Sequence, residues 1–313
     1  MDRMTRWITA PEDAYRLWQE TEAVGADRRP FSARSRVQHT AMFDRFLRHL
    51  RTKDVTVATF GAADVESFFA DVDTRCAPGT TTRLRYGKML DRLCRHLVEE
   101  GIRTRNPVTA MATFERWPED EPVPLFLDVD ADTRLQEWVQ PVAGDDDRAS
   151  RNRAIVALLL GTGMTAAELR QTLCEHLVVD GARPHIEVPK RGPRESRRVS
   201  LPPFAIAPLS AWKEAVTSTS GGESLLFPAP GSASLVNDVL LGAVVRESLE
   251  AIGFRAPDMS PRVLRNTYAR RQLLDGRSNV DVSRLLGLAS QRTVVRLRAT
   301  IEQSTSTQSV ELT

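Results

Sequence analysis

The sequence is poor in cysteine, tyrosine and histidine, and it contains no long apolar run. Its three cysteines, Cys76, Cys94 and Cys174, stand far apart and form no CxxC pair, so neither a disulfide framework nor a zinc site is indicated. No apolar run approaches the roughly 18–20 residues that a bilayer-crossing helix needs. The N-terminal residues also lack the apolar core of a signal peptide. We therefore predict a cytoplasmic protein with no membrane contact, no bound metal and no cofactor.

The distribution of charge is more informative than its sum, a formal net charge of +2. Acidic residues gather at 118–122 and at 145–147, whereas basic residues, nearly all arginine, gather at 83–95, at 190–198 and after position 262. Local basic clusters in a protein that is almost neutral overall are typical of contact with a polyanion. The alternative is a set of solvated surface arginines, which explains one such cluster better than it explains all of them.

The length of 313 residues exceeds the usual size of a single core, so two domains are predicted. The first domain is expected to be helical from 32 to 102. Its first helix starts behind a Ser32 cap and carries an apolar face made of Met42, Phe43, Phe46, Leu47 and Leu50. A shorter helix follows at about 62–72.

The next predicted helix, at about 80–100, has two opposite faces. Its apolar arc contains Tyr86, Leu90, Leu93 and Leu97. The opposite arc contains Arg85, Lys88, Arg92 and Arg95. One face suits a helical core, and the other suits phosphate groups.

Prolines without an apolar period follow from 103 to about 125, which is typical of a linker. Beyond it, residues 184–201 read as two short strands around a basic turn. The other segments of the second domain show helical patterns, at 129–140, 149–160, 204–217, 233–252, 261–274, 279–287 and 291–303.

Several segments resemble the tyrosine recombinase (phage integrase) family. In the first domain they are SARSRVQHTAMFDRFLRHL, VATFGAADVESFF and GTTTRLRYGKMLDRLCRHLVEEGIRTRNPV. In the second they occur in the order of the family, as AIVALLLGTGMTAAEL, VPKRGPRESRRVSLP, SPRVLRNTYARRQLLDG and VSRLLGLASQRTVVRL. The resemblance covers most of the chain from about residue 32 to residue 297.

The resemblance implies a mainly α fold with a small β-hairpin or sheet (α+β). We expect a SAM-like helical core-binding domain followed by a domain with the recombinase catalytic fold. The predicted divisions are an N-terminal helical extension at 1–31, the core-binding domain at 32–105, a linker at 106–125, the catalytic-like domain at 126–303 and a polar tail at 304–313.

Active members of the family attack a DNA phosphate with a tyrosine and hold its oxygens with two arginines, because planar bidentate donors match a phosphate. A lysine and histidines assist proton transfer. In this sequence the hairpin lysine is matched by Lys190 and the second arginine by Arg265. The other positions have changed: Thr165 replaces the first arginine, Arg262, Asn266 and Leu288 replace histidines, and Leu297 replaces the nucleophilic tyrosine.

A count of residue types supports this alignment. The sequence has three tyrosines, Tyr15, Tyr86 and Tyr268, and its last histidine is His185. No small shift of register restores a tyrosine or histidine to the last two segments, and Tyr268 is expected in the core. Loss of the nucleophile abolishes the covalent step. We therefore expect a protein without the strand-transfer activity of the family.

The expected partner is double-stranded DNA, held mostly through its phosphates. The predicted contacts are Arg83, Arg85, Lys88, Arg92, Arg95, Lys190, Arg191, Arg194, Arg262, Arg265, Arg270 and Arg271. Such a protein would act at the nucleoid, in regulation, maintenance or recombination of a mobile element. Family members exchange C-terminal segments, so a second copy or an active recombinase is a further expected partner. An atypical active recombinase and a scaffold that no longer binds DNA are the alternatives.

Overall fold

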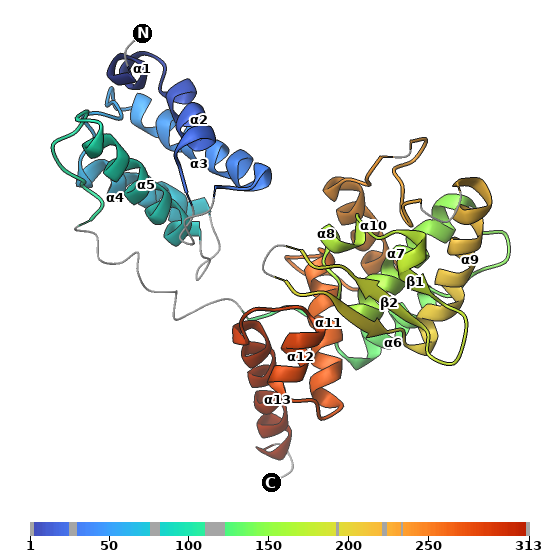
Figure 1. Ribbon diagram of the computed structural model, residues 1–313. Helices are drawn as coiled ribbons and strands as arrows, with labels where there is room; N and C mark the ends of the chain where they lie inside the picture. The colour runs from blue at the N-terminus through green and yellow to red at the C-terminus, as the bar shows by residue number, and fades with distance from the viewer. Residues whose placement is uncertain are drawn as a thin grey trace. The chain divides into compact units, whose positions relative to one another are not determined.

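The computed structural model describes residues 3–24, 30–75, 82–109, 123–191, 194–220, 224–232 and 234–310. The chain forms two compact units, Met1–Pro122 and Val123–Thr313 (Figure 1). Their boundary falls inside the predicted linker at 106–125, most of which lies outside the described residues. No helix among those ranges combines the length and the apolar character needed to span a membrane.

The first unit is a helical bundle of α1 (Arg3–Thr9), α2 (Pro11–Thr21), α3 (Ala33–Arg51), α4 (Ala62–Arg75) and α5 (Thr82–Glu99). Ser32 caps α3 as predicted, because its hydroxyl accepts a hydrogen bond from the amide of Ser35 at 3.2 Å. The apolar arc predicted for α5 is also confirmed, since its four side chains are buried in the core of the unit.

Helices α1 and α2 belong to that core rather than lying outside it as an extension. Trp7, Tyr15 and Trp18 are buried in the same apolar cluster as the residues of α3 and α5. The ring of Tyr15 stacks on Phe43 of α3, with centroids 4.1 Å apart. The first unit therefore includes most of the segment 1–31.

The second unit combines helices with a small antiparallel sheet (Figure 1). The sheet order is β1 (Leu177–Val178), β2 (His185–Val188) and β3 (Arg197–Ser200), and Ile186 pairs with both Leu177 and Val199. The two strands predicted at 184–201 are confirmed. Strand β1 was not predicted, because two residues are too short to show an alternating pattern.

The helices of this unit are α6 (Val129–Trp138), α7 (Asp147–Thr162), α8 (Ala166–Leu169), α9 (Pro203–Ser220), α10 (Asp238–Ala251), α11 (Pro261–Leu274), α12 (Asn279–Leu285) and α13 (Arg292–Val310), with a short 3-10 turn, η2 (Cys174–His176). Helix α7 is central: Ile155 through Leu160 are fully buried, and the helix packs against α9 and α11. A helix that is buried all round carries apolar residues on all its sides, as α7 does here.

Two helix boundaries differ from the prediction by more than three residues. Helix α10 begins at Asp238 rather than near 233, because the side chain of Asn237 caps it by accepting from the amide of Leu240 at 2.8 Å. Helix α13 continues to Val310 instead of stopping at 303, so most of the predicted polar tail is helical.

Candidate functional site

The centre of the candidate site is Glu168, a buried carboxylate in the second unit. Helix α7 ends at Gly163, whose φ of +63° lets the chain turn sharply into α8. Thr165 then caps α8, and its hydroxyl and amide both bond to Glu168 Oε2 at 2.8 Å. This capping box places Glu168 at the start of the helix and holds its side chain in one orientation.

Arginines from the β2–β3 hairpin surround this carboxylate. Arg197 on β3 donates to both oxygens of Glu168 at 2.8 and 3.2 Å, and its side chain is only 7% exposed. Arg194 reaches the Thr165 hydroxyl at 3.1 Å and Glu168 Oε2 at 3.6 Å. Burial raises the pKa of Glu168, but the hydrogen bonds and charge of Arg197 and the bonds from Thr165 outweigh it and lower the pKa to about 2.

Arg265 adds a further cation to the site. Its guanidinium donates to the carbonyls of Gly163 and Leu286 and is partly buried. Burial lowers the pKa of Arg265 to about 10, with Arg194 and Arg197 contributing, so the group stays charged at neutral pH. The predicted contacts Arg194 and Arg265 are thus brought together. Arg194 and Arg197 contact the carboxylate of Glu168, and the charge of Arg265 also interacts with it, which leaves an excess of positive charge here.

Tyr268 lies beneath this arginine cluster, as part of the core. It is 4% exposed and packs against Gly163, where a side chain would collide with its ring. Burial raises the pKa of Tyr268, although several arginines act in the opposite direction. The phenol is therefore protonated at neutral pH, which makes it a poor nucleophile.

A cavity of about 300 Å³ opens beside Arg197, where α12 meets the hairpin. Leu288, predicted to replace a family histidine, contributes an apolar wall to this cavity. Leu297, predicted to replace the family tyrosine, is fully buried in the core on α13. Neither side chain has an atom that transfers a proton or attacks phosphorus.

The remaining predicted residues of α11 have different surroundings. Arg262 is exposed near the start of the helix. Asn266 is buried and donates to the carbonyl of Leu125 at 2.8 Å. Arg270 lies over the ring of Phe126, 4.6 Å from its centroid. Arg271 forms a bidentate pair with Asp132 of α6, with contacts of 2.7 to 3.0 Å, and so ties two helices together.

At the hairpin, Lys190 is 62% exposed and pairs with Glu195 at 3.0 Å. Arg191 donates to the carbonyl of Ala167 and anchors the hairpin to α8. The two residues that follow, 192 and 193, lie outside the described part of the chain.

The predicted DNA-contacting residues of α5 lie in the first unit. Arg85 and Lys88 are exposed, and no partner is recorded for either within the described ranges. Arg95 is also exposed and pairs with Asp91. Arg83 pairs with Asp73 at 2.8 Å, and Arg92 lies over the ring of Phe31, 5.0 Å from its centroid.

Neither Glu168 nor a specific role for Arg197 was predicted from the sequence. A signal for Glu168 was present, because Thr165 followed three residues later by glutamate is a capping-box pattern. No local pattern reveals the partner, since Arg197 meets Glu168 only when the hairpin folds onto α8.

Comparisons with known proteins agree with this architecture. The chain is 26% identical over 242 residues to tyrosine recombinase XerD of Rhizobium meliloti (strain 1021), covering 76% of each protein. It is 27% identical over 208 residues to tyrosine recombinase XerC of Neisseria gonorrhoeae (strain ATCC 700825 / FA 1090), covering 64% of this chain and 62% of that protein. No protein-family model matches the chain.

Solved structures show the same fold. The XerH site-specific recombinase bound to palindromic difH substrate superposes with a TM-score of 0.72 at 15% identity, covering 98% of this chain and 92% of that one. A lambda integrase dimer bound to a COC′ core site gives 0.64 at 15% identity, covering 92% and 75%. With its fold shared by these structures and 76% of its length aligned to a curated recombinase, the chain is similar to tyrosine recombinases.

Proposed function

We propose that this protein binds double-stranded DNA at specific sites through its recombinase fold and does not cut it. The proposal starts from the relatives, which are named as site-specific recombinases or were solved on their DNA substrates. On this basis the protein acts in regulation, maintenance or recombination of a mobile element. It acts alone, or beside an active recombinase that contacts its C-terminal segment.

The environment of Leu297 supports the proposal that the protein does not cut DNA. A fully buried aliphatic side chain in the core leaves no attacking oxygen at this position. Thr165 supplies a hydroxyl instead of a guanidinium, and it is engaged with Glu168 and Arg194. Catalytic groups in such sites act as a unit, so the remaining set retains little activity.

The proposal that the protein binds DNA is supported by basic residues near Glu168 and on α5. Arg197 already pairs with Glu168, so Arg194 and Arg265 add positive charge beyond that pair, and guanidinium groups are suited to phosphate oxygens. Arg85 and Lys88 on α5 are exposed in the manner expected of phosphate contacts. Arg271 is better explained by its pairing with Asp132, and we exclude it from the proposed contacts.

The test has two steps on the same DNA. Gel-shift titration against fragments of the host genome identifies a bound site, and that site is then prepared with a nick on either strand so that a covalent adduct would accumulate. We expect saturable, site-selective binding and no adduct on denaturing gels. A protein–DNA adduct would identify an active recombinase, and the absence of binding to any fragment would favour a scaffold that has lost DNA contact.

A further inference from the structure

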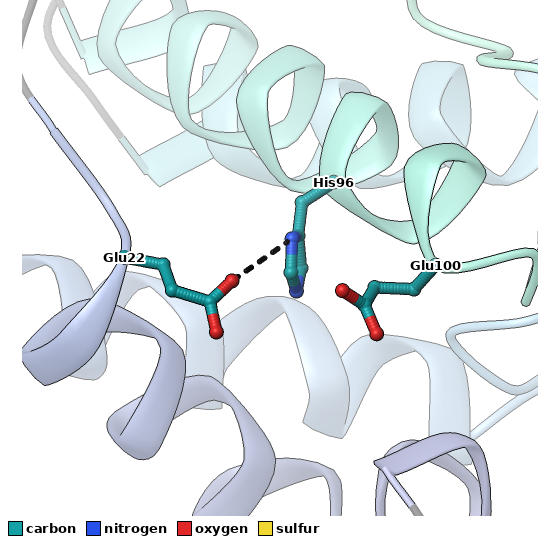
Figure 2. Close-up of side chains that lie close together, drawn as sticks. All are labelled: Glu22, His96 and Glu100. Carbon is teal, nitrogen blue, oxygen red and sulfur yellow. Dashed lines mark ion pairs between the residues drawn. The ribbon is translucent and has the colours of Figure 1, made fainter.

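The first unit contains a group of potential metal ligands that is separate from the proposed DNA-binding residues. Glu22, directly after α2, meets His96 of α5 and Glu100, the residue directly after that helix (Figure 2). One ligand atom from each residue lies within 4.8 Å of the other two. The sequence predicted no metal because that expectation rested on cysteine spacing, and these donors come from segments far apart in the chain.

The geometry has a simple origin in the helix. Glu100 follows α5 directly, and its amide still bonds to the carbonyl of His96 at 2.9 Å, so the two residues stand one helical turn apart on the same side. Glu22 approaches from the end of α2, with its carboxylate 4.0 Å from His96 Nδ1. Figure 2 shows the two carboxylates on either side of the imidazole ring.

The imidazole is held in place by its neighbours. His96 is 8% exposed, and its ring stacks on Trp18 with centroids 4.9 Å apart and an angle of 19° between the planes. The ring of Trp7 lies 5.8 Å away. A ligand ring fixed by packing needs little reorganisation on binding.

We propose that Glu22, His96 and Glu100 form a binding site for a divalent transition metal of the zinc class, completed by water. One imidazole and two carboxylates suit Zn²⁺ better than Ca²⁺ or Mg²⁺, which prefer oxygen ligands only. The ion would join the end of α2 to α5, the helix that carries Arg85 and Lys88. Its role would be structural, and the inference does not depend on the proposed function.

The full-length protein, stripped of metal with a chelator, is titrated with zinc chloride by calorimetry and by tryptophan fluorescence. We expect one zinc per chain and a change in emission, because Trp18 stacks on His96. Each of H96Q, E22Q and E100Q should weaken binding by at least about tenfold, the scale on which metal sites respond to lost partners. Zinc should also raise the Tm of the wild type more than that of these variants.

H185Q provides the matched control, because His185 also lies near a glutamate, Glu187, but at a site with no second carboxylate recorded. It should bind zinc as the wild type does. E22Q changes a partly exposed side chain, so folding of that variant is checked by circular dichroism and is expected to be intact. Absence of zinc binding in the wild type, or unchanged affinity in any of the three site variants, would overturn the proposal.

Discussion

At the residue scale, the pair of Glu168 and Arg197 is the strongest polar interaction in the candidate site. Both side chains are almost fully buried, 2% and 7% exposed, and they bond through two contacts. Breaking a buried pair on one side leaves an unpaired charge in the interior, which costs more than the pair contributes. The first effect of changing Glu168 is therefore expected on stability.

Because the pKa of Glu168 is lowered, the effect of changing this residue on stability should depend on pH. A pKa lowered from 4.5 to about 2 corresponds to about 3 kcal/mol of stability. Because the folded-state pKa is below the unfolded one, this stability is present above pH 4.5 and is lost as the pH falls through about 2. E168Q should therefore lower the free energy of unfolding by about that amount at pH 7, and by much less near pH 2.

Urea unfolding at both pH values measures this difference. The control is E187Q, whose carboxylate pairs with Arg198 at 2.6 Å on the exposed side of the hairpin and should have no measurable effect on stability. An equal loss for E168Q at both pH values would show that the carboxylate charge is not the cause.

At the element scale, α5 has one face in the core and the other in solvent. Tyr86, Leu90, Leu93 and Leu97 are buried, whereas Arg85 and Lys88 are exposed. A change on the exposed face can therefore alter binding without disturbing the core.

The double variant R85E/K88E tests that separation. We expect unchanged Tm and at least about a tenfold loss of DNA affinity, with the slope of log affinity against log salt reduced by about 2, because two phosphate contacts are removed. R16E/R75E is the control with an equal change of charge, since Arg16 and Arg75 are also exposed on helices of the first unit, at 58% and 66%, outside the predicted contacts. Equal losses in the two variants would mean that only net charge matters.

For the ion pair between α6 and α11 we expect a loss of stability without a loss of DNA affinity. Arg271 and Asp132 are 23% and 13% exposed and form a bidentate pair. R271Q should lower the free energy of unfolding by roughly 1.5–3 kcal/mol, the range for hydrogen bonds to charged groups, and leave the DNA affinity of the folded protein unchanged. Chemical denaturation and gel-shift titration measure the two effects. A loss of affinity without a loss of stability would return Arg271 to the proposed DNA contacts.

At the scale of the whole molecule, a net charge of +2 is too small to explain strong DNA binding by itself. Binding must then come from local clusters, which release counterions from the phosphates they contact. If about 6–10 phosphates are contacted, affinity should fall by about 10³–10⁵ between 50 and 200 mM salt. Gel-shift titrations across that range measure the slope. A flat salt dependence would contradict binding through these arginines.

The sequence by itself determined the resemblance to tyrosine recombinases, the helices with a clear apolar face and the prediction that the nucleophilic tyrosine is missing. These follow from local periodicity, from motif order and from the absence of any tyrosine after Tyr268. Periodicity cannot predict a two-residue strand such as β1 or the burial of α1 and α2, because both depend on what packs against them.

Only the tertiary structure decided which arginines are engaged within the protein. Arg197 and Arg271 look alike in the sequence, yet the first is buried against Glu168 and the second is paired with Asp132. The same is true of His96, which meets Glu22 only because α2 packs against α5. A charge is read directly from the sequence, but its partner is set by the folding of distant segments, and that partner decides what the charge does.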